Sequence, residues 1–348
     1  MTPEQLWENV RGEGLLGDGQ VVVMVSGGRD SVCLLDVAVA VGGAEHVRAL
    51  HVNYGLRGQE SDGDESYCAE LCARLGVELE VARPVSRERE PGNLHAWARE
   101  LRYGAAMRLA EELDGREDPA HGIPESPESP GSRESRGSPG SPGPPTVSRA
   151  RVAAGHTASD QVETILYRLA ASPGRRALLG MAPREGRLVR PLLAVTRAQT
   201  TAYCEARGLV WCEDRSNDNE LFARARVRSG LAKALRAVHP AAEANVLRTA
   251  MLLREETALL DGLVDAELAG EQRIAIARLR ELPDALQRMI VVRLAEQAAD
   301  DYVPQAGARV REILDLAERG GRAELHVGGS VSAVIEHRVL TMRRLPPA

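Results

Sequence analysis

A short apolar segment that ends in a polar, glycine-containing turn constrains the fold of this chain most strongly. Residues 20–25 read QVVVMV, which is typical of a strand buried on both faces of a parallel sheet. The turn SGGRDS (26–31) follows, and a helical pattern comes after it. Expected strands at 47–53, 77–82 and 151–154 then alternate with expected helices at 61–75, 93–113 and from about 159. This alternation predicts an α/β doubly wound parallel sheet.

The pattern changes from about residue 219 onward. Long helices are expected at 221–238, 241–269, 283–299 and 305–319, and the short β runs AELHV, SVSAVIE and RVLTMRR come after them. A chain of 348 residues has room for two domains. We therefore expect a first, α/β domain over 1–218 and a second, mainly helical domain over 219–348 that ends in short β-strands.

Residues 114–148 interrupt the first domain. They read DGREDPAHGIPESPESPGSRESRGSPGSPGPPTVS, a low-complexity stretch with almost nothing to bury, and such a segment cannot offset the entropy of ordering itself. The α/β alternation resumes beyond it, so we interpret it as a disordered surface insertion and not as a domain boundary. A proline-rich docking segment is the alternative.

Composition excludes several classes of protein. The net charge of −6 gives no reason to expect indiscriminate attraction to nucleic acid. Lys233 is the sole lysine, so no P-loop lysine is present near the glycine turn and a Walker-type site is excluded. Aromatic residues make up 3% of the chain, which disfavours a base-stacking platform as the main mode of binding.

The cysteines and the amino-terminal segment both point to the cytoplasm. Five scattered cysteines without a C-x-x-C pair are expected to be reduced thiols that pack as small apolar side chains. The opening MTPEQLWENV has no basic region, and no apolar run reaches the roughly 18 residues of a membrane span. We expect a cytoplasmic protein with no membrane partner.

The SGGRDS turn predicts an anion site. Two glycines let the backbone approach an anion closely, and the amide groups at the start of the next helix point outward with the positive end of the helix dipole. In an α/β sheet this position is also where the ligand crevice lies. The turn lacks both GK[ST] and G-x-G-x-x-G, so neither standard nucleotide loop explains it.

A basic segment lies between Arg168 and Arg236, with a local charge of +8 from fourteen basic and six acidic residues. At 100° per residue, Arg224 and Arg228 share a helix face and Arg226 points away. We expect the first two to grip one polyanion, because this charge opposes that of the whole chain.

The SGGRDS turn resembles the PP-loop of the ATP pyrophosphatase superfamily, whose members split ATP into pyrophosphate and an adenylated intermediate. Further segments make the resemblance more specific. They are HVNYGLRG (51–58), NLHAWAR (93–99), GHTASDQVET (155–164), LGM (179–181), RPLL (190–193) and EDRSN (213–217). In this order and spacing the chain resembles the tRNA(Ile)-lysidine synthase family, strongly over about residues 19–240 and loosely beyond.

The resemblance implies an ATP- and Mg²⁺-dependent ligase that forms a carbon–nitrogen bond. It also implies that residues 1–218 are the ATP-binding catalytic domain and that residues 219–348 are the tRNA-binding domain. In that family ATP adenylates the C2 carbonyl oxygen of the wobble cytidine in an isoleucine tRNA with a CAU anticodon. Free L-lysine then displaces AMP to form lysidine, which changes codon specificity from AUG to AUA. The partners are therefore this tRNA and lysine, and a homodimer is left open.

The resemblance and the chemistry together assign roles to individual residues. Asp30, His156 and Asp160 are the expected catalytic residues, and Asp30 and Asp160 the expected magnesium ligands. His156 is expected to contact a phosphate or to move a proton. The expected ATP-binding residues are Ser26, Gly27, Gly28, Arg29, Asp30, Ser31 and Asn53. The expected substrate and tRNA contacts are Glu163, Arg190, Asp214, Arg224 and Arg228.

Two questions stay open at this point. Asp160 and Glu163 could hold the ammonium group of lysine in place of a metal, or simply favour the helix dipole. The chain also departs from the family pattern at Tyr54, Ser159 and Ala225, each of which removes a polar contact. The alternative functions are tRNA base thiolation, another PP-loop reaction on a small molecule, and non-catalytic tRNA binding.

Overall fold

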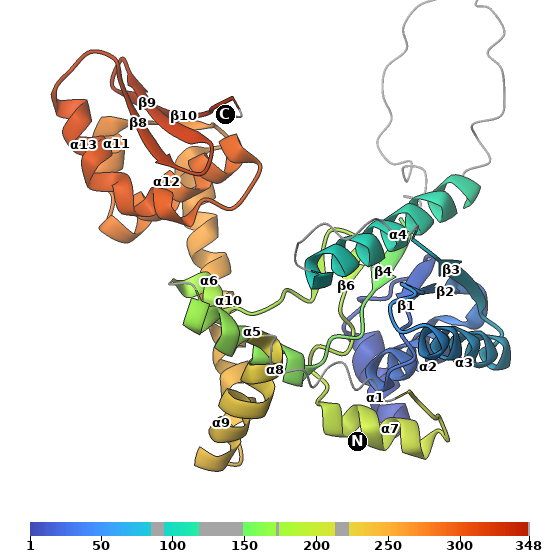
Figure 1. Cartoon of the computed structure of the whole chain (residues 1–348). Coiled ribbons are helices and arrows are strands. Elements are labelled where there is room, and N and C mark those ends of the chain that lie inside the picture. Colours follow the sequence, from blue (N-terminus) through green and yellow to red (C-terminus); the bar gives the residue numbers. More distant parts are fainter. Residues whose placement is uncertain (85–93, 118–148, 172–173, 213–222, 347–348) are drawn as a thin grey trace, which may run out of the picture. The chain divides into compact units, whose positions relative to one another are not determined.

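The chain divides into two compact units, Met1–Arg248 and Thr249–Ala348 (Figure 1). The computed structural model describes residues 1–84, 94–117, 149–171, 174–212 and 223–346. The expected domain boundary at 218/219 and Asp214 lie outside these ranges, and so does the expected insertion from residue 118 on. No helix in the described ranges is long and apolar enough to cross a membrane.

The first unit is built on a sheet in the order β3-β2-β1-β4-β6-β5. Its strands are β1 (Val21–Met24), β2 (Val47–Val52), β3 (Glu78–Ala82), β4 (Arg151–Ala153), β5 (Arg184–Glu185) and β6 (Leu188–Val189). All neighbours pair in parallel except β5 and β6, which pair antiparallel. The prediction of an α/β sheet dominated by parallel strands is confirmed.

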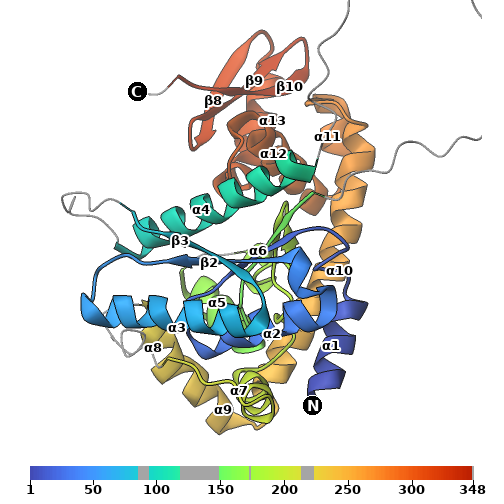
Figure 2. The ribbon, with the colours of Figure 1, turned by 90° about the vertical axis from the view of Figure 1, so that its right-hand side faces the viewer.

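Helices cover both faces of this sheet (Figure 2). The bounds are α1 (Pro3–Gly12), α2 (Arg29–Gly42), α3 (Gln59–Leu75), α4 (Leu94–Glu117), α5 (Ala158–Ala171), α6 (Arg175–Leu178) and α7 (Arg197–Ala206). Side chains of α1, α2, α3 and α7 form one core with inward-facing residues of β1 and β2. Helix α4 forms a separate core on the other face, with Ala106, Ala110 and Leu113. The two buried faces explain why β1 is apolar throughout.

The segment expected as one helix over 221–238 is not uniform. Its described part comprises α8 (Ala223–Arg226), the π-helical segment η4 (Val227–Ala232) and α9 (Lys233–Val238), which begins at the exposed Lys233. A π-helix closes its hydrogen bonds five residues apart, so the 100° spacing does not hold beyond Arg226.

The second unit has its own apolar core, to which Ile290, Leu294, Ile313 and Leu340 contribute. Helix α10 (Ala242–Leu268) crosses the division between the units, and α11 (Ile276–Glu281), α12 (Asp284–Ala299), the 3₁₀ segment η5 (Pro304–Arg309) and α13 (Val310–Glu318) follow. An antiparallel sheet has the order β7-β10-β9-β8, formed by β7 (Arg273–Ala275), β8 (Ala323–Gly328), β9 (Val331–Glu336) and β10 (Val339–Arg344). The helical region with terminal strands is confirmed, whereas β7 and α11 were not expected.

Candidate active site at the carboxyl edge of the sheet

The SGGRDS loop leaves β1 and enters α2 as a tight hydrogen-bonded turn. Gly27 has φ of +83°, a conformation that side chains rarely adopt. The Ser31 hydroxyl donates to the Gly28 carbonyl at 2.7 Å and lies 3.2 Å from the Ser26 hydroxyl. Helix α2 begins at Arg29, and no side chain caps it. Amide groups at a helix start that no side chain caps are suited to binding an anion.

A second loop, between β4 and α5, packs directly on the first one. A Cβ atom at Gly155 would lie 3.0 Å from the Asp30 carbonyl oxygen and 3.2 Å from the Ser31 nitrogen. Any side chain there would separate the two loops. The sequence thus places His156 and Asp160 beside the SGGRDS loop by leaving position 155 without a side chain.

Arg197, the first residue of α7, connects the carboxylates of both loops. Its NH2 group donates to Asp160 Oδ1 at 2.8 Å and its NH1 group to Glu163 Oε1 at 3.2 Å. Its Nε atom lies 3.7 Å from Asp30 Oδ2. One guanidinium group therefore gathers three of the residues expected at the site, and their charges raise the Arg197 pKa although burial, the largest influence, lowers it.

Asp30 has additional partners on both sides. The Thr200 hydroxyl donates to Asp30 Oδ1 at 2.5 Å, and Arg29 Nε donates to the same oxygen at 3.2 Å. Arg29 also donates to the Thr200 hydroxyl oxygen at 3.2 Å. Helix α7 thus holds the Asp30 carboxylate in one orientation at the start of α2.

Asp160 and Glu163 are fixed in different ways. Thr157 donates to Asp160 Oδ2 through its backbone N–H and its hydroxyl, both at 2.8 Å, so Asp160 braces the first turn of α5. The Glu163 side chain is 7% exposed. Arg228 in η4 donates to its two oxygens at 2.9 and 3.3 Å. Arg228 therefore pairs with a buried carboxylate of the site, although it was expected to contact tRNA.

His156 lies in the same loop with a depressed pKa. Burial, the largest influence, lowers its pKa to about 4, and the positive charges of Arg190, Arg99 and Arg102 act in the same direction while Asp160 opposes them. The ring is neutral at pH 7, and its buried Nδ1 atom has no hydrogen-bond partner. A neutral imidazole can donate one hydrogen bond and accept another, but it brings no charge to a phosphate.

Asn53 and Arg190 have partners other than the Arg197 cluster. Asn53 follows β2, and its amide donates to Asp62 and Glu65 of α3 at 3.2 and 2.9 Å. Arg190 follows β6 and donates to the Ala182 carbonyl at 2.6 Å and to Glu185 at 3.1 Å. Arg224 belongs to α8.

Arg197 and Thr200 were not singled out from the sequence, although a signal was present. Thr196 and Gln199 form a capping box, which marks the start of α7 and places Arg197 in its first turn. A cation there faces the positive end of the helix dipole, an unfavourable position on its own. Carboxylates near the arginine compensate for this unfavourable interaction with the dipole. An arginine just after a helix cap therefore indicates that an acidic side chain from another part of the chain lies next to it.

The two expected magnesium ligands are already engaged by protein donors. Each of the four carboxylate oxygens of Asp30 and Asp160 accepts from a protein donor at 3.4 Å or less. Within the described ranges, no group of three or more His, Cys, Asp or Glu side chains is arranged to hold a metal ion. Enzyme-bound Mg²⁺ is commonly held by one or two carboxylates together with substrate phosphates. These carboxylates fit that pattern once Arg197 gives way to a phosphate-bound ion.

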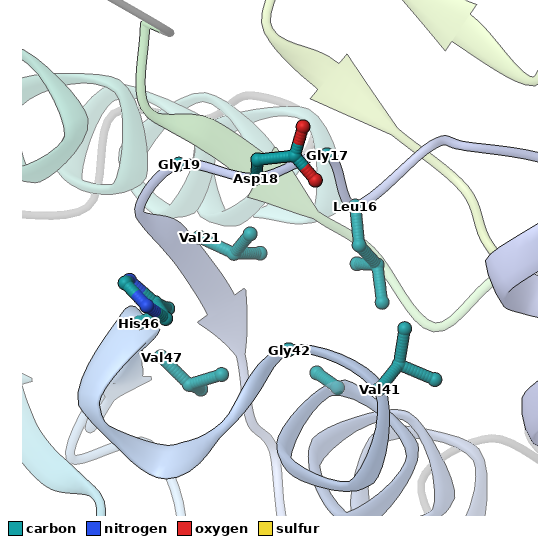
Figure 3. A pocket seen from close by; sticks show the side chains of 10 residues that line it. Leu16, Gly17, Asp18, Gly19, Val21, Val41, Gly42, His46 and Val47 are labelled. Atoms are coloured by element: carbon teal, nitrogen blue, oxygen red, sulfur yellow. The ribbon is translucent and has the colours of Figure 1, made fainter.

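A surface cavity of about 230 Å³ lies at the opposite edge of the sheet (Figure 3). Val21 and Val47, which start β1 and β2, line it together with Gly42 and His46. The SGGRDS loop follows the other end of β1. This cavity therefore has no contact with the expected site residues.

Comparison with known proteins assigns the fold to a class. A family described as the PP-loop domain matches residues 4–116 and 147–235. Among solved structures, the U34-tRNA thiolase NcsA from Methanococcus maripaludis with its [4Fe-4S] cluster superposes with a TM-score of 0.51 at 16% identity. The match covers 72% of this chain and 78% of that chain. The first unit is a PP-loop domain, in a class of proteins that use ATP.

Sequence relatives narrow the class to one family. The chain is 31% identical to the tRNA(Ile)-lysidine synthase of Dehalococcoides mccartyi, covering 93% of this chain and 67% of the relative. It is 34% identical to that of Solibacter usitatus over 89% of this chain and 64% of the relative. It is 33% identical to that of Gloeobacter violaceus, covering 80% of this chain and 78% of the relative. The chain belongs to the tRNA(Ile)-lysidine synthase family, and it spans about two thirds of the length of the first two relatives.

Proposed function

We propose that this protein ligates free L-lysine to C2 of the wobble cytidine of an isoleucine tRNA with a CAU anticodon, using ATP. The observation that carries the proposal is the bridge made by Arg197. It joins Asp30 of the SGGRDS loop to Asp160 and Glu163 of α5. A loop suited to phosphate and a pair of carboxylates suited to an amine thus share one site, in a chain of this family.

The first step is adenylation of the base. The C2 carbonyl oxygen of cytidine attacks the α-phosphorus of ATP, a new P–O bond forms, and the bond to pyrophosphate breaks. Backbone amides of the SGGRDS loop and the Ser26 hydroxyl stabilise the leaving pyrophosphate, because they are donors fixed before the reaction. The Ser31 hydroxyl donates to the Gly28 carbonyl and so holds the loop in this shape. Neutral His156 donates a hydrogen bond to a phosphate oxygen.

The second step transfers lysine. Its amine attacks C2, the bond from C2 to the activated oxygen breaks, and AMP leaves with that oxygen. The attacking nitrogen loses a proton, for which Asp160 and Glu163 are the nearby acceptors. Arg197 and Arg228 orient these carboxylates.

We propose Asp30 and Asp160 as the residues that hold Mg²⁺ together with the phosphates of ATP. Bound there, the ion neutralises negative charge on the triphosphate. Arg197, whose Nε atom lies 3.7 Å from Asp30 Oδ2, would then be available to bind a phosphate oxygen through its guanidinium group.

For the RNA substrate, we propose that residues 219–348 form the tRNA-binding domain and that Arg190, Arg224 and Asp214 contact the RNA. Arg228 acts through Glu163 in this proposal, because its guanidinium group already forms two hydrogen bonds there. A cytoplasmic location agrees with a tRNA substrate.

Pyrophosphate release and lysine incorporation test the function together. The protein is incubated with ATP, Mg²⁺, lysine and a transcript of the CAU-anticodon tRNA, and each component is omitted in turn. We expect pyrophosphate release to require the tRNA, and mass spectrometry of the digested tRNA to show a lysine-modified cytidine. A transcript with a GAU anticodon is the matched control. Release that does not depend on tRNA, or an unmodified cytidine, contradicts the proposal.

A further inference from the structure

Helix α4 extends over the face of the sheet toward the site. It forms a core with β1 and β4 through Ala106, Ala110 and Leu113, which are at most 4% exposed. Near its carboxyl end, the Asp114 side chain accepts a hydrogen bond of 2.6 Å from the backbone of Ala150, just before β4. That end of α4 therefore lies at the amino edge of the sheet. The first turns of α4 lie toward the opposite edge, where the SGGRDS loop and His156 are found.

One face of α4 is apolar near the carboxyl end of the helix and polar near its amino end. Positions 99, 103, 106, 110 and 113 repeat at spacings of four and three, which places them on one helix face. The last three are apolar, whereas the first two are Arg99 and Tyr103. The guanidinium carbon of Arg99 lies 4.4 Å from the centre of the Tyr103 ring, and that of the adjacent Arg102 lies 5.7 Å from it.

Neither Arg99 nor Arg102 forms an ion pair or a hydrogen bond with any residue in the described ranges. The Arg102 Nε atom and the Tyr103 hydroxyl are buried without a partner. Most other arginines of the site, such as Arg197 and Arg228, have carboxylate partners. A buried donor without a partner costs about 1 to 3 kcal/mol, so a ligand that bonds to Arg102 and Tyr103 would remove a cost that the protein bears without it. Arg99 is exposed, and its donors are accessible to such a ligand.

The unpartnered atoms gather near His156. Tyr103 packs against the core that contains Ala154, two residues before His156. Ala153 pairs with Val189 in the sheet, so Arg190 follows its strand beside the same loop. The charges of Arg99, Arg102 and Arg190 also lower the His156 pKa, although burial is the larger cause. Among the described residues, the Nδ1 atom of His156 and the Nε atom of Arg190 have no partner, and Arg190 as a whole is 3% exposed. Three positively charged groups with unused donors thus adjoin the loop that packs on the SGGRDS turn.

We propose that Arg99, Arg102 and the Tyr103 hydroxyl form, with His156 and Arg190, a second phosphate-binding subsite beside the SGGRDS loop. Its ligand is a phosphate group, because a planar guanidinium fork matches phosphate oxygens, and within the described ranges neither Arg99 nor Arg102 has a carboxylate partner. Two sources carry this chemistry, ATP itself and the RNA backbone next to the target nucleotide. The choice of these sources rests on the proposed function.

Binding measurements on the full chain test the subsite without catalysis. The variants are Arg99→Gln and Arg102→Gln. Arg108→Gln is the matched control, since it makes the same charge change at an exposed position about 200° around α4 from Ala106. The probes are α,β-methylene-ATP and the CAU-anticodon transcript, each titrated without lysine. We expect both site variants to weaken binding of the same probe by about tenfold, and the control by less than twofold.

The affected probe identifies the source. Weaker binding of the ATP analogue alone assigns the subsite to ATP. Weaker binding of RNA alone, with a log–log salt slope reduced by up to about 0.9, assigns it to the RNA backbone. If Arg102→Gln does not fold, the exposed Arg99 carries the test by itself. Unchanged binding of both probes overturns the proposal. The assay contains no lysine and measures no turnover, so its result can be interpreted even if the protein does not catalyse the proposed ligation.

Discussion

Helices α2 and α7 are joined by two clusters of the same chemistry in very different surroundings. The site junction consists of Asp30, Arg197 and Thr200, and the buried junction of Asp36, Tyr203 and Arg207. In each, a carboxylate of α2 meets a hydroxyl group and an arginine of α7. The Asp30 side chain is 21% exposed, whereas Asp36 is 2% exposed.

The difference between the junctions lies in what else their groups contact. Asp36 accepts hydrogen bonds from Tyr203 and from two nitrogens of Arg207, and Trp7 donates to the Tyr203 hydroxyl at 2.8 Å. Burial and the Asp36 carboxylate raise the Tyr203 pKa, so the phenol stays protonated. In the site junction, Arg197 divides its donors among three carboxylates and stays accessible to solvent. One junction is suited to ligand exchange and the other to holding the helices together.

The largest effect is expected when Asp30 is changed to Asn. The substitution keeps the shape but removes a negative charge needed beside the triphosphate, so tRNA-dependent pyrophosphate release should fall by about 10²- to 10³-fold. The free energy of unfolding should change by less than about 1 kcal/mol, because Asp30 is partly exposed. Release at a near wild-type rate would remove Asp30 from the reaction.

The buried junction should respond in the opposite way. Asp36→Asn removes the ionic partner of Arg207, whose side chain is 39% exposed, and should lower the free energy of unfolding by about 2 kcal/mol, measured by urea denaturation. Tyr203→Phe should lower it by about 1 kcal/mol. Turnover per folded molecule should stay within about twofold for both. A large loss of turnover in folded protein would mean that this junction also shapes the site.

His156, beside the site junction, predicts a pH dependence of stability. Its pKa is about 4 in the folded protein, whereas an unfolded histidine titrates near 6.5. Between these values the unfolded chain binds more protons, so stability rises with pH and is lost as pH falls from about 6.5 toward 4. His156 should therefore make the free energy of unfolding about 2 kcal/mol lower at pH 5 than at pH 7.5.

Comparison of two histidine variants isolates that contribution. His156→Gln should remove most of the difference between pH 5 and pH 7.5. Replacing the exposed His46 by Gln should leave the difference in place. An identical pH profile in the His156 variant would show that this ring is not buried in its neutral form.

The smallest effect is expected for Arg197→Ala. Pyrophosphate release should slow by about tenfold, because Asp30, Asp160 and Glu163 lose the cation that orients them. The concentration of Mg²⁺ at half-maximal rate should fall, since the guanidinium no longer competes for these carboxylates. Arg207→Ala is the matched control and should leave the Mg²⁺ requirement unchanged. A higher Mg²⁺ requirement in the Arg197 variant would indicate that the arginine assists the metal.

The order of elements and the phosphate loop could be predicted from the sequence because they depend on local patterns. The run 20–25 is apolar throughout since both faces of β1 are covered. Helices α10 and α12 agree with their expected ranges to within one residue. These features follow from periodicity and turn chemistry, which a short window of sequence contains.

The partners of the site side chains could not be predicted because they join distant parts of the chain. Asp30 and Thr200 are 170 residues apart, and Arg228 is 65 residues from Glu163. With 43 arginines in the chain, Arg197 is not distinguished by its type. The π-helical segment η4 also turns Arg228 toward α5, and an ideal helical spacing does not anticipate that rotation.

The exposed Lys233 at the start of α9 has a consequence for chemical selectivity. A base activated for attack by an amine reacts with any unprotonated amine that reaches it, including those of the protein. Arginine stays charged and is not a nucleophile at neutral pH, so 43 of the 44 cationic side chains are inert toward such an intermediate. In the proposed reaction, lysine supplied from solution would therefore meet almost no competition from the cationic side chains of the protein. For the same reason, an amine-reactive dye will label this chain at Lys233 and at the amino terminus alone.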